Sequence, residues 1–132
     1  MVAAIITTPI LLICSFLSKA VKDTLAHHFK GSIFKGINDQ FYDASISHAN
    51  KWKNGDKSQG EAFWLSSTLL VWLTDGWHRF DAIQALCWQI ALTIWVTIAL
   101  PYPWYYGFGV FAAIKLCTVA FHYPYTYLFI KK

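Results

Sequence analysis

Three ionisable side chains stand together where a long apolar stretch is interrupted once by polar residues. Asp75, His78 and Asp81 follow one another at steps of three residues. Such steps keep side chains on one side of a helix, within an arc of about 120°. A carboxylate beside an imidazole can tune a general base, or can orient a histidine that binds a metal ion through its other nitrogen. We therefore take Asp75, His78 and Asp81 as candidate catalytic residues, and His78 with the later His122 as candidate metal ligands.

The same cluster also has a purely structural interpretation. Asp75 and Arg79 are four residues apart, the spacing of an ion pair on a helix. Asp81 precedes a long apolar run and is of a residue type that caps helix N-termini. The sequence leaves both interpretations open.

A second set of chemistry-bearing residues is Asp23, His27 and His28. Asp23 and His27 are spaced for one helical face, as metal ligands are in helical bundles. On a regular helix the adjacent His27 and His28 point about 100° apart, so they cannot both reach one ion. Lys19 and Lys30 flank the same face and would repel a metal. The two hypotheses are a divalent metal site and a solvated amphipathic face.

A third set, Lys51, Trp52 and Lys53, is typical of a surface that binds lipid headgroups. Ammonium groups attract the lipid phosphate, while an indole ring inserts among the headgroups. Plain interfacial anchors have the same composition, so specific headgroup recognition is one of two interpretations.

The elements that must position these residues are membrane helices. The chain has 132 residues, of which 56% are hydrophobic and 14% charged, against about 25% charged in soluble domains. A helix needs about 20 apolar residues to cross a bilayer. We predict an all-α fold: a polytopic membrane helical bundle that forms a single integral membrane domain over residues 1–132. Its four transmembrane helices are expected at about 2–18, 62–77, 82–100 and 108–130.

Residues 19–61 form the water-compatible part of this topology, as an interfacial or cytoplasmic segment. The first helix is expected to continue as an amphipathic extension to about Phe29, and a short helix is expected over about 38–53. Seven lysines in this segment place it in the cytoplasm by the positive-inside rule, with both chain ends outside. In a plain four-span topology the lysine segment and the 75–81 turn then face opposite sides of the membrane. They can serve one substrate only if residues 62–77 do not cross fully.

Composition also narrows the function classes. The net charge of +4 comes from lysines beside the spans, so we expect no nucleic-acid partner. The cysteines, Cys14, Cys87 and Cys117, fall in apolar stretches and are expected to be inert thiols rather than a disulfide framework. The first apolar stretch lacks a preceding positive charge and a convincing cleavage site, which favours an uncleaved first span. The signatures of lipid phosphatases, alcohol phosphotransferases and membrane di-iron enzymes are incomplete or absent.

Three short strings resemble those of small uncharacterised membrane proteins of Bacteroidota and their phages. They are Asp23-Thr24-Leu25-x-His27-His28-Phe29, Ser47-x-x-Asn50-Lys51-Trp52-Lys53 and Thr74-Asp75-Gly76-Trp77-His78. The resemblance spans residues 19–80. It implies a location in a bacterial cytoplasmic (inner) membrane, and it carries no established activity.

Two functional hypotheses follow. In the first, a polar Asp/His site at a membrane face binds a divalent metal ion or acts on lipid headgroups, with His78 as base or ligand and Asp75 as its orienting partner. In the second, the protein is a non-catalytic homo-oligomer, such as a pore, a holin-like lesion former or an accessory subunit. Lys115, inside the last apolar stretch, favours the second hypothesis because a charge there must face a partner helix, a lumen or the interface. Membrane lipids are the expected partners in both.

Overall fold

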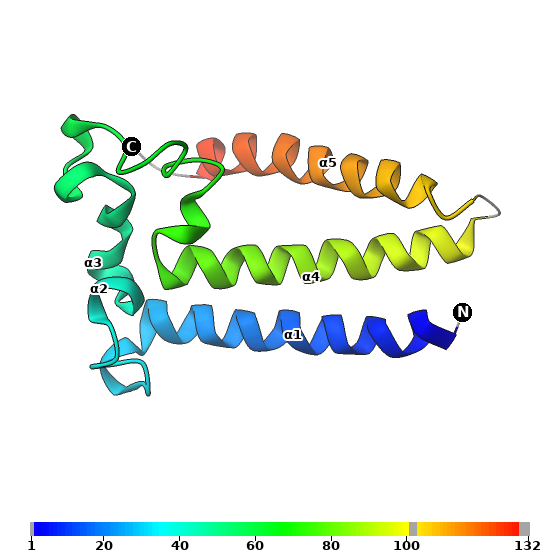
Figure 1. The fold of residues 1–132 in the computed structure, drawn as a ribbon, viewed down its shortest axis with the longest axis horizontal. Helices are drawn as coiled ribbons and strands as arrows, with labels where there is room; N and C mark the ends of the chain where they lie inside the picture. The colour runs from blue at the N-terminus through cyan, green and yellow to red at the C-terminus, as the bar shows by residue number, and fades with distance from the viewer. Residues whose placement is uncertain (1, 101–102, 130–132) are drawn as a thin grey trace. The chain divides into compact units, whose positions relative to one another are not determined.

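Three long helices make up most of this chain. The computed structural model describes the backbone of residues 2–100 and 103–129, and the side chains of residues 4–100 and 103–117. The long helices are α1 (Val2–His27), α4 (Gly76–Ala99) and α5 (Tyr106–Phe129), drawn in Figure 1. Among the described residues, the one β-type pairing is an isolated antiparallel bridge between Trp52 and Glu61. The predicted all-α fold is confirmed.

The chain divides into two compact units, and α1 and α4 each contribute to both. One unit is Ile13–Leu86, and the other comprises Met1–Leu12 with Cys87–Lys132. The candidate residues at positions 23–28, 51–53 and 75–81 all belong to the unit Ile13–Leu86. Of the residues proposed from sequence, only His122 and Lys115 fall in the other unit.

In the unit Ile13–Leu86, α1 and α4 lie side by side and run antiparallel (Figure 1). The Ser15 hydroxyl donates to the backbone carbonyl of Gln84 at 3.3 Å, and the Lys22 ammonium donates to Asp81 at 2.7 Å. Two turns separate these contacts on α1, and their order is reversed on α4. The C-terminal end of α1 and the N-terminal end of α4, which carry the polar residues, therefore lie next to each other. The segment 28–75 connects these two ends.

Close packing at the start of α4 depends on a glycine. A Cβ on Gly76 would lie 2.9 Å from the Tyr42 ring and 3.1 Å from Leu25 Cδ1. Leu25 is itself buried, with 1% of its surface exposed. The first turn of α4 can approach α1 and the segment 39–42 only because position 76 has no side chain.

The connecting segment 28–75 consists of short turns held by side-chain caps. Its two α-helical turns are α2 (Asp39–Tyr42) and α3 (Ala44–Ser47), whose N-cap residues are Asn38 and Asp43. The side chains of these two residues accept hydrogen bonds from the backbone amides of Phe41 and Ser45, as N-caps do. The remaining short elements are single 3-10 turns at Phe29–Gly31, His48–Lys51, Lys53–Gly55, Lys57–Gln59 and Val71–Leu73. The helix expected over about 38–53 is thus broken into several turns.

The prediction of a transmembrane helix over residues 62–77 is wrong. Residues 62–74 form bends, turns and one 3-10 turn, and α4 begins only at Gly76. Polar side chains capture the backbone groups that a helix would use. The Glu61 carboxylate accepts from the amides of Leu65 and Ser67 and from the Ser67 hydroxyl, while the Ser66 hydroxyl donates to the carbonyl of Lys51 at 2.8 Å. Side-chain bonds of this kind compete with helix formation, and Leu65 takes a left-handed φ of 58°.

In the other unit, the start of α5 approaches the end of α4. A Cβ on Gly107 would meet the Thr97 hydroxyl oxygen at 3.0 Å. The hydroxyls of Thr93 and Thr97 donate to carbonyls four residues earlier on α4, at 2.7 and 2.8 Å. These bonds leave the helix surface there apolar. An apolar groove of about 630 Å³ lies here, lined from α4 by Ile90 and Ile94 and from α5 by Phe108 and Phe111, among others.

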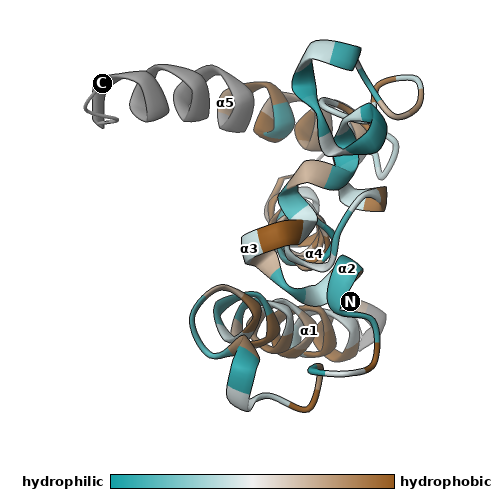
Figure 2. Ribbon diagram, turned by 90° about the vertical axis from the view of Figure 1, so that its left-hand side faces the viewer, coloured by the Kyte–Doolittle hydropathy of each residue, from teal (hydrophilic) through white to brown (hydrophobic). Residues whose placement is uncertain are grey.

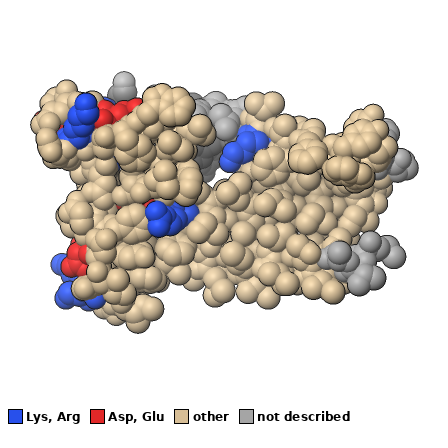
Figure 3. Space-filling model, in the orientation of Figure 1, with Lys and Arg blue, Asp and Glu red and all other residues tan. Residues whose placement is uncertain are grey.

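Among the described residues, two helices are long and apolar enough to cross a membrane, over Ala4–His27 and Gly76–Ala99. Only 17% of each apolar stretch is buried within the protein. The expected spans at 2–18 and 82–100 fall largely within these helices, and the one at 108–130 falls largely on α5, whose described apolar part is Tyr106–Cys117. The four expected spans are therefore not found in the part of the chain that the structure describes. Hydrophilic residues gather on the short connecting segments (Figure 2), and on the face drawn in Figure 3 charged side chains lie mainly over the turns of the connecting segment, with further basic side chains over the long helices.

Candidate functional site

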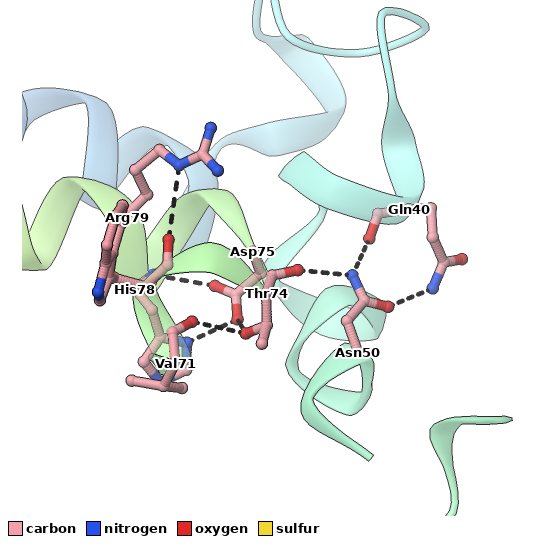
Figure 4. Close-up of polar contacts among 8 residues, drawn as sticks. Gln40, Asn50, Val71, Thr74, Asp75, His78 and Arg79 are labelled. Atoms are coloured by element: carbon pink, nitrogen blue, oxygen red, sulfur yellow. Dashed lines mark hydrogen bonds and ion pairs between the residues drawn. The ribbon is translucent and has the colours of Figure 1, made fainter. Parts of the chain in front are cut away.

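The centre of the candidate site is a carboxylate–imidazole pair at the first turn of α4 (Figure 4). One oxygen of Asp75 lies 2.6 Å from His78 Nδ1, and the other accepts from the His78 backbone amide at 2.9 Å. Asp75 directly precedes Gly76 and thus occupies the N-cap of α4. The capping position brings Asp75 and His78 together, because an N-cap carboxylate reaches the residue three positions later.

The Asp75 carboxylate is buried, with 1% of the residue exposed. Burial by itself would raise the pKa of this carboxyl group. The hydrogen bonds from the ring and amide of His78, the charge of His78 and the hydroxyl of Thr74 outweigh burial and hold the pKa below its ordinary value of 3.8. Asp75 is therefore an anion at neutral pH and can only accept hydrogen bonds. The proton between the two side chains belongs to His78 Nδ1, which leaves Nε2 as the basic nitrogen of the neutral ring.

A second layer of hydrogen bonds holds the turn before α4. The Thr74 hydroxyl lies 2.9 Å from Asp75 and 2.7 Å from the carbonyl of Val71, and its single proton can serve one of them at a time. The Asn50 amide nitrogen donates to the carbonyls of Thr74 at 3.0 Å and Gln40 at 2.8 Å. The Asn50 oxygen accepts from the Gln40 side chain at 2.6 Å (Figure 4). Asn50 therefore links two segments: the turn that contains Asp75 and the segment that contains α2.

The pair faces a pocket of about 300 Å³ between α1, α3 and α4. His78 side-chain atoms are 24% exposed, against 1% for Asp75, so the imidazole is the accessible member of the pair. The pocket is also lined by Ser47, His48 and Trp77. Among the described residues the buried Ser47 hydroxyl has no hydrogen-bond partner. The arrangement provides an oriented base with a second imidazole and a free hydroxyl in the same cavity.

Asp81 does not join this pair. Its carboxylate pairs with Lys22 of α1 at 2.7 Å, and its side chain is 48% exposed. The proposal that Asp81 caps the helix is wrong, because α4 begins at Gly76, five residues earlier, and Asp75 takes the cap. The ion pair proposed between Asp75 and Arg79 is also not formed. Arg79 instead donates to the carbonyl of Trp72 at 3.5 Å and stacks its guanidinium 4.6 Å from the centre of the Phe41 ring.

In the second candidate set, Asp23 makes a different contact from His27 and His28. The Lys19 ammonium donates to the Asp23 carboxylate, four residues along α1. His27 and His28 come together although a regular helix would separate them, because α1 ends at His27 and the backbone of His28 leaves the helical conformation (φ −130°, ψ 16°). Their ring centres are 6.5 Å apart. Both line a pocket of about 620 Å³ that Lys30 and Asp43 also border.

No set of metal ligands converges within the part of the chain whose side chains are described. Across residues 4–100 and 103–117, no group of three or more His, Cys, Asp or Glu side chains is placed to hold a metal ion. The proposed ligands Asp23, His27, His28 and His78 therefore do not form a joint site. The side chain of His122 lies outside the described residues.

In the third candidate set, Lys51 and Trp52 contact each other. The ammonium groups of Lys51 and Lys57 lie 5.9 and 5.8 Å from the centre of the Trp52 ring, so this indole lies between two cations. Lys53 is exposed and pairs through its backbone amide with the carbonyl of Gly60. The cation–indole pairing of Lys51 and Trp52 fits the interfacial composition noted above. Lipid binding by Lys51, Trp52 and Lys53 stays a prediction.

Several residues that build the site were not singled out as site residues from sequence. They are Ser47, His48, Asn50, Thr74 and Lys30. Ser47, Asn50 and Thr74 do lie in the three short strings that were singled out from the sequence. Those strings share the unit Ile13–Leu86, and two of them line the pocket of His78. Comparison with protein-family models, curated proteins and solved structures gives no match.

Proposed function

We propose that the protein is an integral membrane protein that catalyses hydrolysis at the membrane surface, with His78 as general base and Asp75 as its orienting partner. The observation that carries this proposal is the 2.6 Å contact between the buried Asp75 carboxylate and His78 Nδ1, at the wall of an open pocket. A fixed Nδ1–H directs the lone pair of Nε2 to the accessible side of the ring. There it can take a proton from water as the water oxygen attacks an ester group of the substrate. The ester bond then breaks, and the proton passes from Nε2 to the oxygen of the departing alcohol.

Membrane integration is supported by the surface of the two long helices. Five-sixths of each apolar stretch is unburied within the protein, whereas the core helix of a soluble protein would be mostly covered. On α1, the side chains of Ile6, Ile10 and Leu17 are each about 60% exposed. The contacts of Ser15 with Gln84 and of Lys22 with Asp81 tie α1 to α4, which supports α1 as a permanent part of the protein.

In the proposed topology the polar elements lie on one side of the membrane. With residues 62–74 in turns, the whole segment from the end of α1 to the start of α4 stays on one side of the membrane. The lysines of this segment and the Asp75–His78 pair then face the same compartment, which the positive-inside rule makes the cytoplasm. The resemblance noted from sequence fits a bacterial inner membrane. A substrate at this surface, such as a lipid headgroup, can reach the pair from the water side.

The test is turnover of lipid by the purified full chain. Vesicles of phosphatidylglycerol and phosphatidylethanolamine are incubated with the protein, and ³¹P NMR and mass spectrometry detect released products. Wild type should form product, and His78→Gln should lose about 10²–10⁴-fold in rate, the contribution of a general base. Asp56→Asn, in an exposed turn with its carboxylate bonded to Ser58, is the matched control and should match wild type. Equal turnover by wild type and His78→Gln, or none by either, would overturn the proposal.

A second candidate function is that of a homo-oligomer, and it rests on Lys115. This lysine is exposed on the apolar helix α5. A charge in that setting is stabilised by a polar partner or a water-filled lumen. Mass measurement in detergent should then give a multiple of the 15.1 kDa chain, and Lys115→Leu should change the oligomer or close its conductance. A monomer that leaves liposomes tight would exclude this role.

A further inference from the structure

We infer that the pocket at the end of α1 binds a phosphate group, and that the substrate of the neighbouring Asp75–His78 pair is a phosphate-bearing molecule. The inference rests on the proposed function for the reaction, but the binding step can be tested without turnover. It assigns a role to the residues that follow the apolar part of α1. Their proposed use as metal ligands has no support among the described side chains.

The pocket brings together three side chains that donate hydrogen bonds to anions. His27, His28 and Lys30 line it, in a volume of about 620 Å³. All three side chains are exposed to solvent, so a ligand can reach them. An imidazole donates an N–H in either protonation state, and a lysine ammonium donates three. Donors around a concave surface are the usual means of holding a phosphate.

Two sources of negative charge at the pocket oppose the binding of a phosphate. Asp43 borders the pocket, and hydrogen bonds from the side chain and amide of Ser45 hold the pKa of its carboxyl group below 3.8, so it is ionised. Its Oδ1 is occupied by Ser45, with contacts of 2.6 and 2.9 Å. The carbonyl end of α1 also carries partial negative charge, which basic residues offset. A phosphate must therefore be held by several donors at once, and single cations here would not suffice.

Two of the side chains that line the pocket are apolar and buried. Leu25 is 1% exposed and Phe29 is 8% exposed, and both line it. The short segment that carries His27, His28 and Lys30 is therefore anchored by two buried side chains. Anchoring before the ligand arrives lowers the ordering cost of binding.

The phosphate pocket adjoins the pocket of the Asp75–His78 pair. Ala26 of α1 and Ser45 of α3 line both cavities. A molecule with its phosphate among His27, His28 and Lys30 can therefore extend past this shared wall toward His78. This adjacency is the reason that we assign a phosphate-bearing substrate to the pair.

The position along α1 is compatible with two sources of phosphate. Lys19 marks where charged residues begin, and His27 lies eight residues beyond it, about 12 Å along the helix at 1.5 Å per residue. A lipid headgroup or a water-soluble phosphate compound can be held at this level. Both present the same chemistry, and the experiment separates them.

The test measures binding to the full chain in micelles of an uncharged detergent, by native mass spectrometry and titration calorimetry. The probes are dioctanoyl phosphatidic acid, dioctanoylglycerol and inorganic phosphate. Phosphatidic acid should bind at least about tenfold more tightly than dioctanoylglycerol, which lacks the phosphate. If inorganic phosphate binds as tightly as phosphatidic acid, the natural source is soluble; if it binds much more weakly, the source is a lipid. Equal binding of phosphatidic acid and dioctanoylglycerol would overturn the inference.

Variants then locate the site. Lys30→Ala and His28→Ala should each weaken phosphatidic acid binding about tenfold, and Lys30→Arg should restore most of it. Lys35→Ala removes the same charge from an exposed position outside both pockets and should change binding less than twofold. An equal loss in Lys35→Ala would mean unspecific attraction and would contradict the site. His78→Gln should keep binding while it loses turnover, so failure of the proposed reaction is distinguished from failure of the phosphate pocket.

Discussion

Two substitutions of Asp75 separate its role as a helix cap from its role in orienting His78. In the native chain one carboxylate oxygen accepts from the His78 amide and the other from the His78 ring. An asparagine keeps one oxygen for the amide, and it caps helices about as well as aspartate. Its other group is a neutral amide that cannot replace the anion. Asp75→Asn therefore keeps the cap and removes the ion–imidazole bond, whereas Asp75→Ala removes both.

The expected losses in the free energy of unfolding follow from the hydrogen bonds that each substitution removes. A hydrogen bond to a charged group contributes about 1.5–3 kcal/mol, and an N-cap contributes about 1 kcal/mol. Asp75 is buried, so solvent does not weaken these contributions. Asp75→Asn should lower the free energy of unfolding by about 1.5–3 kcal/mol, and Asp75→Ala by about 2.5–4 kcal/mol.

The assay is unfolding in mixed micelles by increasing dodecyl sulfate, followed by the loss of helical circular dichroism. Asp81→Asn is the matched control, because Asp81 forms a half-exposed ion pair with Lys22. Such a pair contributes at most about 1 kcal/mol. If Asp75→Asn is as stable as wild type, or if Asp81→Asn costs as much as Asp75→Asn, the argument for a structured Asp75–His78 pair is refuted.

Three further predictions concern the packing and charge around this pair. Gly76→Ala should destabilise the protein by about 1–3 kcal/mol through overpacking, measured by thermal melting, whereas Gly109→Ala, where no atom lies within 4 Å, should cost nothing; equal melting temperatures would contradict the close approach at α4. Asn50→Ala should lower stability by about 1–3 kcal/mol, because it removes the bonds to Thr74 and Gln40, and faster amide exchange in residues 71–75 should accompany it; unchanged exchange would count against this link. Because the folded-state pKa of Asp75 is depressed, its contribution is complete above 3.8 and is lost as the pH falls below that value. Melting temperature should therefore decrease on acidification, and Asp75→Asn should decrease less; parallel curves would show that Asp75 does not contribute.

The long helices and the Asp75–His78 contact could be predicted from the sequence because both follow from local spacing. Unbroken apolar runs set α1, α4 and most of α5. Three-residue spacing brings His78 to Asp75 in a first helical turn. The same rule failed for Asp81, since the helix begins at Gly76 rather than at residue 82 and Lys22 of another helix competes for the carboxylate.

The segment 62–77 shows why apolar composition alone was not sufficient there. Its residues are apolar enough for a helix, but Glu61 captures the amides of Leu65 and Ser67 and stops the helical ladder. That capture depends on a contact between side chain and backbone that hydropathy does not register. This matters for the proposed function, because the lysine segment and the Asp75–His78 pair belong to the same unit, Ile13–Leu86.

The pockets could not be predicted from sequence because they are made by distant residues. His48 and His78 are 30 positions apart and line one cavity, brought there by the turns of the connecting segment. His27 and His28 share another cavity because α1 ends between them. No spacing rule indicates where a helix of this kind will stop, since no strong C-cap residue follows His27 directly.

The protonation of the His78 ring tests the central claim most directly. ¹⁵N NMR of histidine-labelled protein in lipid nanodiscs, with His78 assigned through His78→Gln, distinguishes the two ring nitrogens. We predict that the neutral ring carries its proton on Nδ1, with Nε2 free, and that Asp75→Asn removes this preference. A neutral ring protonated on Nε2, or a spectrum unchanged by Asp75→Asn, would contradict the claim that Asp75 holds His78 as a base.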